Sequence, residues 1–340
     1  MAKMKKTATG KNKLKNMSDT NLLLLITVIV FFLMYIGAIV FQGGGFLKPQ
    51  TFFNILNANA ALLIASCGLS IDISVGGVAA LVSMCCAVYL DHMGGNVVVS
   101  LLIAIGIGLA FGIVQGYLVA YLDIQPFIVS LAGMFFARGM TTIVHTNPFN
   151  VENKAFVALK DTRVVVPGMG TVNRIGKYVD AYVEIGVVVA VLLVILLFFV
   201  LRYTKLGRSF YAVGGNRQSA LMLGINVKRT RFLAHLICGL LAGIGGYVYF
   251  LHVGSGAASH ATGMEMNAIA SSIIGGTLLT GGVGNIIGTF FGVMSLSTIQ
   301  NIVSSAGLDQ AWWTGITVAA MLCLFLVIQS VIMARKSRSN

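Results

Sequence analysis

The most constraining feature of this sequence is a series of apolar runs, each about 20 residues long, with almost no charged residue inside them. A helix needs about 20 mostly apolar residues to cross the hydrocarbon core of a bilayer. The chain is 57% hydrophobic and 10% charged, whereas soluble domains carry roughly 25% charged residues. The sequence therefore predicts an all-α polytopic membrane protein, and it argues against a soluble enzyme, a disordered chain or a nucleic-acid-binding domain.

Ten such runs can be separated, and we predict a transmembrane helix for each. The boundaries between the second and third runs, and between the eighth and ninth, are indistinct because glycine-rich apolar sequence joins them. A basic stretch precedes the first run, as in a signal peptide, but the run exceeds the roughly 7–15 residues of a signal core. The predicted spans are 22–41, 52–71, 73–90, 97–120, 126–145, 183–201, 231–251, 267–281, 284–304 and 311–333.

Basic residues are concentrated in three segments outside these spans. The segments 1–20, 202–231 and 334–340 hold six, seven and three of them, which is 16 of the 23 lysines and arginines. Lys and Arg in short loops mark the cytoplasmic side, and ten spans place all three segments on one side. We therefore predict cytoplasmic N- and C-terminal tails, a transmembrane domain over 21–333 with a cytoplasmic loop at 202–231, and an extracytoplasmic loop over 146–182.

The cytoplasmic loop contains the signals of one short helix. Asn216 is a favourable N-cap and Gly224 a favourable residue just beyond a helix end, so we predict a helix over 217–223. An isolated two-turn helix is unstable in water. Two explanations remain open for what holds it, namely the groove of a partner protein or the anionic headgroups of the membrane.

Several polar side chains interrupt the predicted spans. Neutral amides both donate and accept hydrogen bonds, which suits sugar hydroxyls, although bonds between helices explain them equally well. Arg138 is predicted in the outer half of the fifth span, where snorkelling, a helix-packing hydrogen bond or an outer gate would each account for it. The candidate substrate-path residues are Asn54, Asn57, Asn59, Asp72, Gln115 and Arg138.

Other motifs limit the chemistry. Gly108, Gly112 and Gly116 repeat at four-residue spacing, which predicts close helix packing inside one subunit or between subunits. The sequence has no GxxxxGK[ST] phosphate loop, so we do not expect ATP hydrolysis by this chain. The five cysteines lie in apolar runs without ligand spacing, and we predict neither a metal site nor a disulfide.

Several segments resemble the membrane subunits of bacterial sugar ABC importers of the ribose type. YAVGGNRQSALMLGINV (211–227) is similar to that family's cytoplasmic coupling segment, and IDISVGG (71–77) to its GIDLSVG signature. IASSIIGGTLLTGGVGNIIGTFFG (269–292) resembles its glycine-rich late segment. PFIVSLAGMFFARGM (126–140) and the two tryptophans at 312–313 look most like galactofuranose-type permeases, and the likeness extends over nearly the whole chain.

The resemblance implies a permease subunit in the bacterial inner membrane that gives alternating access to a monosaccharide, galactofuranose or a related sugar. It implies no catalytic residue and no bound cofactor, because cytoplasmic P-loop ATPase subunits use the ATP and Mg. It also implies an extracytoplasmic sugar-binding protein and a second permease subunit that is a different chain. The stretch 62–72 is shorter than in the family, which predicts a shortened second span. The implied ATPase-coupling residues are Gly207, Gly214, Gly215, Asn216, Ala220, Leu221, Met222, Gly224 and Ile225.

Three rival functions remain. An ion-gradient-driven secondary sugar transporter would need an ion site inside the membrane. An intramembrane enzyme acting on lipid-linked sugars would need a catalytic acid cluster, and a sensing module would need no transport path.

Overall fold

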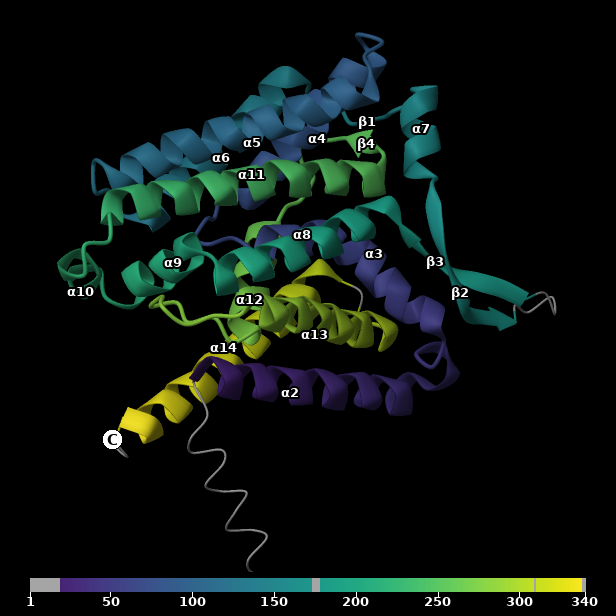
Figure 1. The fold of residues 1–340 in the computed structure, drawn as a ribbon. Helices are drawn as coiled ribbons and strands as arrows, with labels where there is room; N and C mark the ends of the chain where they lie inside the picture. Colours follow the sequence, from purple (N-terminus) through teal and green to yellow (C-terminus); the bar gives the residue numbers. More distant parts are fainter. Residues whose placement is uncertain (1–18, 173–177, 309, 338–340) are drawn as a thin grey trace, which may run out of the picture.

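The computed structural model describes residues 19–172, 178–308 and 310–337, and its helices form a single bundle (Figure 1). Each of the ten predicted spans contains a helix. Seven helices in the described part of the chain are long and apolar enough to cross a membrane. They are α2 (Asp19–Gln42), α5 (Val97–Ala120), α6 (Pro126–Val144), α8 (Ile185–Tyr203), α11 (Val227–Val253), α13 (Ile286–Ser305) and α14 (Ala311–Ser337).

The other three predicted spans form shorter or more polar helices. α3 (Pro49–Ser66) follows the 3-10 turn η1 (Gly43–Gly45), and its 18 residues include three asparagines. α4 (Val75–Asp91) has 17 residues, and α12 (Met264–Ile274) has only 11. At 1.5 Å per residue α12 extends about 16 Å, which is roughly half of the hydrocarbon core.

Two predicted helix ends are wrong, and both lie in glycine-rich sequence. The second span was expected to reach 71 and the eighth 281, but α3 ends at Ser66 and α12 at Ile274. Gly276, Gly281 and Gly282 adopt positive φ angles of 76° to 89°, which a right-handed helix excludes. The apolar composition of these segments therefore hides the fact that the helices are interrupted inside the bundle.

The structure also contains short strands, which the all-α prediction did not include. The long loop predicted over 146–182 holds the helix α7 and an antiparallel hairpin with an irregularity in its register, and a second, two-residue pair ties this loop to the end of α11. These elements are β1 (Phe149–Asn150), α7 (Lys154–Lys160), β2 (Arg163–Val172), β3 (Tyr178–Glu184) and β4 (Ser255–Gly256).

The two ends of the bundle differ in what they carry. The start of α2, the end of α14 and two further short helices, α9 (Lys205–Gly215) and α10 (Arg217–Met222), lie at the left end in Figure 1. The β2–β3 hairpin and α7 lie at the right end. The predicted basic segments thus adjoin one end, although residues 1–18 and 338–340 lie outside the described part. That this end faces the cytoplasm remains a prediction from the charges.

Glycines bring α5 and α11 into backbone contact along one side of the bundle. A Cβ atom on Gly112 would lie 2.9 Å from the carbonyl oxygen of His235, and one on Gly243 would lie 2.5 Å from that of Ala104. Gly108 similarly faces Gly239. The predicted close packing is therefore confirmed, and it occurs inside one subunit.

Candidate functional site

The short helix predicted in the basic loop is present and is capped as expected. The Oδ1 atom of Asn216 accepts a hydrogen bond from the backbone N–H of Ser219 at 2.9 Å. Gly224 has φ +77°, and this turn lets the N–H of Ile225 donate to the carbonyl of Ala220 at 3.1 Å. Such a left-handed turn after the last helical residue is a common helix terminus. α10 thus forms despite its length because both of its ends are satisfied.

α10 presents an apolar surface that the described part of the chain does not cover. Ala220 is 1% exposed and anchors the helix, whereas Leu221, Met222 and Leu223 are 56%, 79% and 77% exposed. Three consecutive large apolar residues at this exposure, at the end of a six-residue helix and its C-cap, are costly to leave in water. The surface therefore suits a partner protein or the membrane interface.

α9, which the sequence did not predict as a helix, carries three of the four glycines expected in the coupling segment. A Cβ on Gly214 would lie 2.7 Å from the backbone nitrogen of Gly282, while one on Gly215 would meet only the Cα of Gly282 at 3.8 Å. A Cβ on Gly207 would collide with the backbone of Leu201. These glycines let α9 pack against the end of α8 and against the non-helical segment 275–285, which joins α12 to α13.

An ion cluster connects α10 to the turn between α5 and α6. Arg217 on α10 and Arg231 on α11 donate to the Oδ1 atom of Asp123 at 2.9 and 2.5 Å. Hydrogen bonds from Arg231 and then Arg217 hold the pKa of Asp123 below its ordinary value. We call these three residues the Asp123 cluster. Sequence reasoning missed Asp123. A signal was available, because Asp123 is an acid in a short loop, and the charge pattern places this loop on the same side of the membrane as the basic loop 202–231, which contains no acid.

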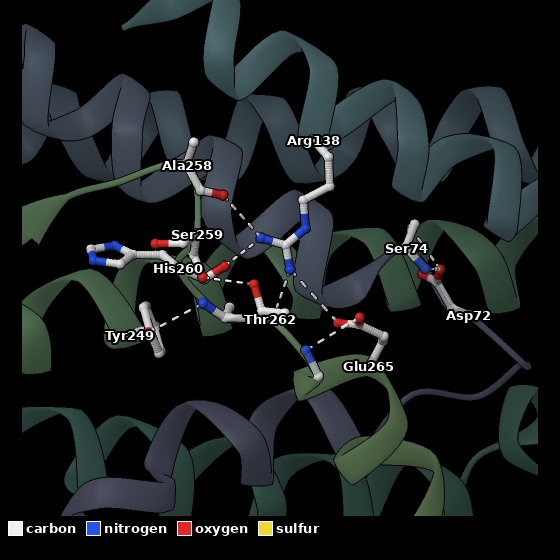
Figure 2. Close-up of polar contacts among 11 residues, drawn as sticks. Asp72, Ser74, Arg138, Tyr249, Ala258, Ser259, His260, Thr262 and Glu265 are labelled. Atoms are coloured by element: carbon white, nitrogen blue, oxygen red, sulfur yellow. Dashed lines mark hydrogen bonds and ion pairs between the residues drawn. The ribbon is translucent and has the colours of Figure 1, made fainter. Parts of the chain in front are cut away.

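Arg138 lies at the centre of a second polar group, shown in Figure 2. Its guanidinium donates to the carbonyl oxygens of Ala258 at 3.3 Å, His260 at 2.5 Å and Ala261 at 3.0 Å. It also lies 3.9 Å from the Oε2 atom of Glu265. We call this group the central cluster. The structure thus shows hydrogen bonds that pack the helix against a neighbouring segment, while a role of Arg138 at an outer gate stays a prediction.

The central cluster fixes a segment that is not helical. Residues 254–263 follow α11 as turns and a two-residue strand, and Ser83 of α4 donates to the carbonyl of Ser255 at 3.0 Å. The segment therefore lies against the sides of α4 and α6. The guanidinium donates to carbonyls of this non-helical segment, although that of Ala261 also accepts from the backbone N–H of Met264 at 3.2 Å. Buried backbone groups require such partners.

Glu265 was not among the predicted site residues, but it completes this cluster. It lies in the first turn of α12, is 9% exposed, and its Oε1 atom accepts from the backbone N–H of Gly263 at 3.3 Å. Its Oε2 atom has no hydrogen-bond partner in the described part of the chain. A side chain on Gly76 of α4 would collide with this oxygen. The available signal was an acid two residues after a glycine at the start of an apolar run.

Asp72 and Gln115 are brought together by a buried hydroxyl. The Oδ1 atom of Asp72 accepts from the backbone N–H and the Oγ of Ser74 at 2.8 and 2.6 Å. Gln115 donates to the same Oγ at 2.8 Å. This chain of bonds satisfies the start of α4 and links it to α5, and Figure 2 shows Asp72 and Ser74 beside the central cluster.

The three asparagines of α3 do not join this group. Asn57 is buried and accepts from the backbone N–H of Glu184, at the end of β3, at 2.9 Å. Asn59 donates to the carbonyl of Ile55 on its own helix at 2.7 Å, and Asn54 accepts from Gln50 at 2.6 Å. Their polar groups are thus used to build α3 and to hold the hairpin.

A cavity of about 230 Å³ lies between the interrupted helices and α9. This volume is far above the roughly 15 Å³ that one water needs. Its walls are the chain after α3, which includes Asp72, the chain after α12, and Phe210 and Tyr211 of α9. The cavity therefore borders α9, next to the exposed helix α10.

Comparison with known proteins identifies the family. Residues 51–326 match the family described as branched-chain amino acid transport system / permease component. An inner membrane ABC transporter permease protein, YjfF, of Escherichia coli is 34% identical over 320 residues, which cover 92% of this chain and 93% of that protein. The fructose import permease protein FruG of Bifidobacterium longum is 30% identical, covering 91% of each chain.

The ribose import permease protein RbsC of Escherichia coli is 30% identical over 289 residues, which cover 83% of this chain and 86% of that protein. No solved structure matches the chain. The family match, these relatives and the seven apolar helices all agree. This chain therefore belongs to the branched-chain amino acid transport system / permease component family and is a multi-pass protein of the bacterial inner membrane.

Proposed function

We propose that this chain is the membrane-spanning permease subunit of an ATP-driven importer of a monosaccharide. Relatives of similar length are named as import permeases for fructose and ribose. The observation that carries the proposal is α10, a capped helix with an uncovered apolar surface, tied to the bundle by the Asp123 cluster. Because the chain has no phosphate loop, ATP and Mg are used by cytoplasmic P-loop ATPase subunits that dock on α10.

The contacts of this region supply a route from the ATPase to the bundle. Arg217 connects α10 to the α5–α6 turn, and Gly214 of α9 packs on Gly282 between α12 and α13. A displacement of the α9–α10 unit would therefore act on two halves of the bundle at once. Rigid-body movement of packed helices is a common basis of switching between two states, and here it would alternate the access of the sugar.

The path of the sugar is proposed along the non-helical segment 254–263. Irregular backbone at membrane depth is tolerated only where protein or water contacts it, because lipid cannot satisfy its polar groups. Ser259, Thr262 and Met266 are exposed in the single chain, so they face a second permease subunit or the path itself. This placement keeps Arg138 and Asp72 as candidate path residues and gives the asparagines of α3 a structural role.

The proposed function also includes a sugar-binding protein, a second permease subunit and a sugar cargo. An extracytoplasmic sugar-binding protein would deliver the sugar at the end that carries the β2–β3 hairpin and α7. The second permease subunit is proposed to be a different chain. Galactofuranose or a related monosaccharide is the proposed cargo, supported by the sequence resemblance over 126–140 and at the two tryptophans.

The test is co-purification of the tagged chain from its host in mild detergent, followed by mass spectrometry. We expect a P-loop ATPase in the eluate of the wild type and of Met222→Leu, and its loss from Met222→Glu, which places a charge on the apolar surface. Monodisperse elution of the wild type and both variants provides the folding control. An ATPase that is absent from the wild type, or retained equally by Met222→Glu, would contradict docking on α10.

One observation bears on ion-driven transport as the second candidate. Glu265 is a buried acid with one oxygen that accepts no hydrogen bond in the described part of the chain, and such acids mark ion pathways in other membrane proteins. Uptake by the chain alone in proteoliposomes, driven by a proton or sodium gradient and lost in Glu265→Gln, would favour this candidate. Uptake that requires ATP and an ATPase subunit would exclude it.

A further inference from the structure

An apolar groove runs along the outside of the bundle between α5 and α11. Its volume is about 540 Å³. The rings of Tyr117 and Tyr121 stack with centroids 5.4 Å apart, and Tyr121 meets Phe232 edge-on at 6.1 Å. The lining residues are Ile113, Val114, Tyr117, Leu118, Tyr121 and Phe232. Because α5 and α11 are both membrane-spanning helices, the groove opens toward the acyl chains of the bilayer.

The groove ends at a group of basic side chains. Tyr121 lies two residues before Asp123, and Phe232 directly follows Arg231, so the Asp123 cluster stands at the predicted cytoplasmic end of the groove. Two arginines share one carboxylate there, which leaves an excess positive charge, and Arg217 is 52% exposed. Lys228 and Arg229 are exposed in the first turn of α11.

An apolar groove that ends in excess positive charge is complementary to one class of molecule. An anionic phospholipid places its acyl chain in the membrane and its phosphate at the headgroup level, where basic pockets between helices bind it. Tyrosine is enriched at the same level because its ring is apolar and its hydroxyl polar. A zwitterionic lipid would fill the groove equally well, but its headgroup has no net negative charge to pair with the excess positive charge.

We propose that this groove holds one acyl chain of an anionic phospholipid and that the lipid phosphate binds Arg217 and Arg231 beside Asp123. Guanidinium groups bind phosphate through two parallel hydrogen bonds. The phosphate then shares these arginines with Asp123, so the lipid contacts α10 directly. A consequence that rests on the proposed function is that anionic lipid alters the docking of the ATPase; the binding site itself does not depend on that function.

The site is tested with the full chain purified in detergent, by native mass spectrometry and by thermal unfolding with added lipid. Phosphatidylglycerol should be retained and should raise the melting temperature more than phosphatidylcholine with the same acyl chains. Val114→Trp fills the groove from an exposed position and should abolish the difference between the two lipids. Arg217→Gln should weaken retention of phosphatidylglycerol about fivefold, the weight of one basic residue at an anionic surface.

Arg202→Gln is the matched control, because it removes a base from the end of α8, which contributes no residue to the groove. It should leave lipid retention unchanged. Inorganic phosphate at the same concentration should have no effect, since it has no chain to place in the groove. Equal stabilisation by both lipids, full retention in Arg217→Gln, or an equal shift with phosphate alone would each overturn the proposal. None of these readouts uses the ATPase, so a failure of the lipid-site proposal is distinguishable from a failure of the proposed function.

Discussion

The central cluster and the Asp123 cluster both use arginine, but they differ in the partners of the arginines and in how far the carboxylate is exposed. Arg138 is mostly enclosed, with 21% of its side chain exposed, and it donates mainly to backbone carbonyls of a neighbouring segment. In the Asp123 cluster Arg231 is similarly enclosed at 18%, but Arg217 and Asp123 are 52% and 57% exposed, and the cluster joins side chains across the end of the bundle. Solvent and ions screen the second group far more than the first.

This difference indicates what each cluster is suited to do. Removing one member of a buried polar group leaves its partners without hydrogen bonds, which is strongly destabilising. Exposed ion pairs contribute little to stability, so they can break and form again at low cost. The central cluster is therefore suited to hold the interrupted helices, and the Asp123 cluster is suited to movement of α10.

The largest expected effect comes from breaking the central cluster. Arg138→Met should lower the free energy of unfolding by about 3 kcal/mol or more, because it leaves three carbonyls and Glu265 without their cation. SDS-induced unfolding in mixed micelles measures this loss. Arg202→Met, at an exposed helix end, is the control and should change little. An Arg138→Met protein as stable as the wild type would show that the cluster does not hold the fold.

A substitution of Glu265, the ion-pair partner of Arg138, tests whether the two side chains are coupled. In a double-mutant cycle, Glu265→Gln should cost less in the Arg138→Met background than in the wild type, because the carboxylate no longer has a cation to lose. Strictly additive losses would show that Arg138 acts on the carbonyls alone.

The next effect concerns the contact between α9 and the segment 275–285. Gly214→Ala places a Cβ 2.7 Å from the nitrogen of Gly282, so one backbone must shift, and overpacking of this kind costs about 1–3 kcal/mol. We expect ATP-driven uptake in proteoliposomes to fall sharply. Gly215→Ala is the neighbouring control, since its Cβ meets Gly282 at an ordinary 3.8 Å. Equal uptake by the two variants would remove α9 from the route between the ATPase and the bundle.

These examples also show what the sequence could and could not reveal. Local signals were sufficient for α10, because Asn216 and Gly224 act on their own backbone neighbours. The ends of α3 and α12 were missed because apolar composition does not distinguish a continuous helix from one interrupted by glycine. Asp123 and Glu265 were missed because their partners are 94 or more residues away in one case and 127 in the other. Such pairings depend on the packing of the whole bundle.

A smaller effect is expected from the turn that ends α10. Gly224 has φ +77°, and a β-branched side chain there would cost about 1–3 kcal/mol of local strain. Gly224→Val should therefore uncouple ATP hydrolysis from uptake while the bundle still folds, whereas Gly224→Asn, which tolerates a left-handed conformation, should retain coupling. The ratio of ATP hydrolysed to sugar taken up is the measurement. Normal coupling in Gly224→Val would count against docking at this helix.

The smallest effect on stability, and the clearest on movement, is expected from Asp123. Asp123→Asn removes the charge that holds Arg217 and Arg231, and because Asp123 and Arg217 are more than half exposed the unfolding curve should change little. Spin labels at exposed positions of α10 and of the α5–α6 turn should show a broader distance distribution in the variant. Because the arginines lower the pKa of Asp123, the wild type should keep the narrow distribution above the ordinary aspartate range and lose it only as the pH falls through the lowered pKa. A distance distribution that is equally narrow in Asp123→Asn would mean that α9 alone positions α10. The Asp123 cluster would then have no role in the movement of α10, in contrast to the role proposed for it above.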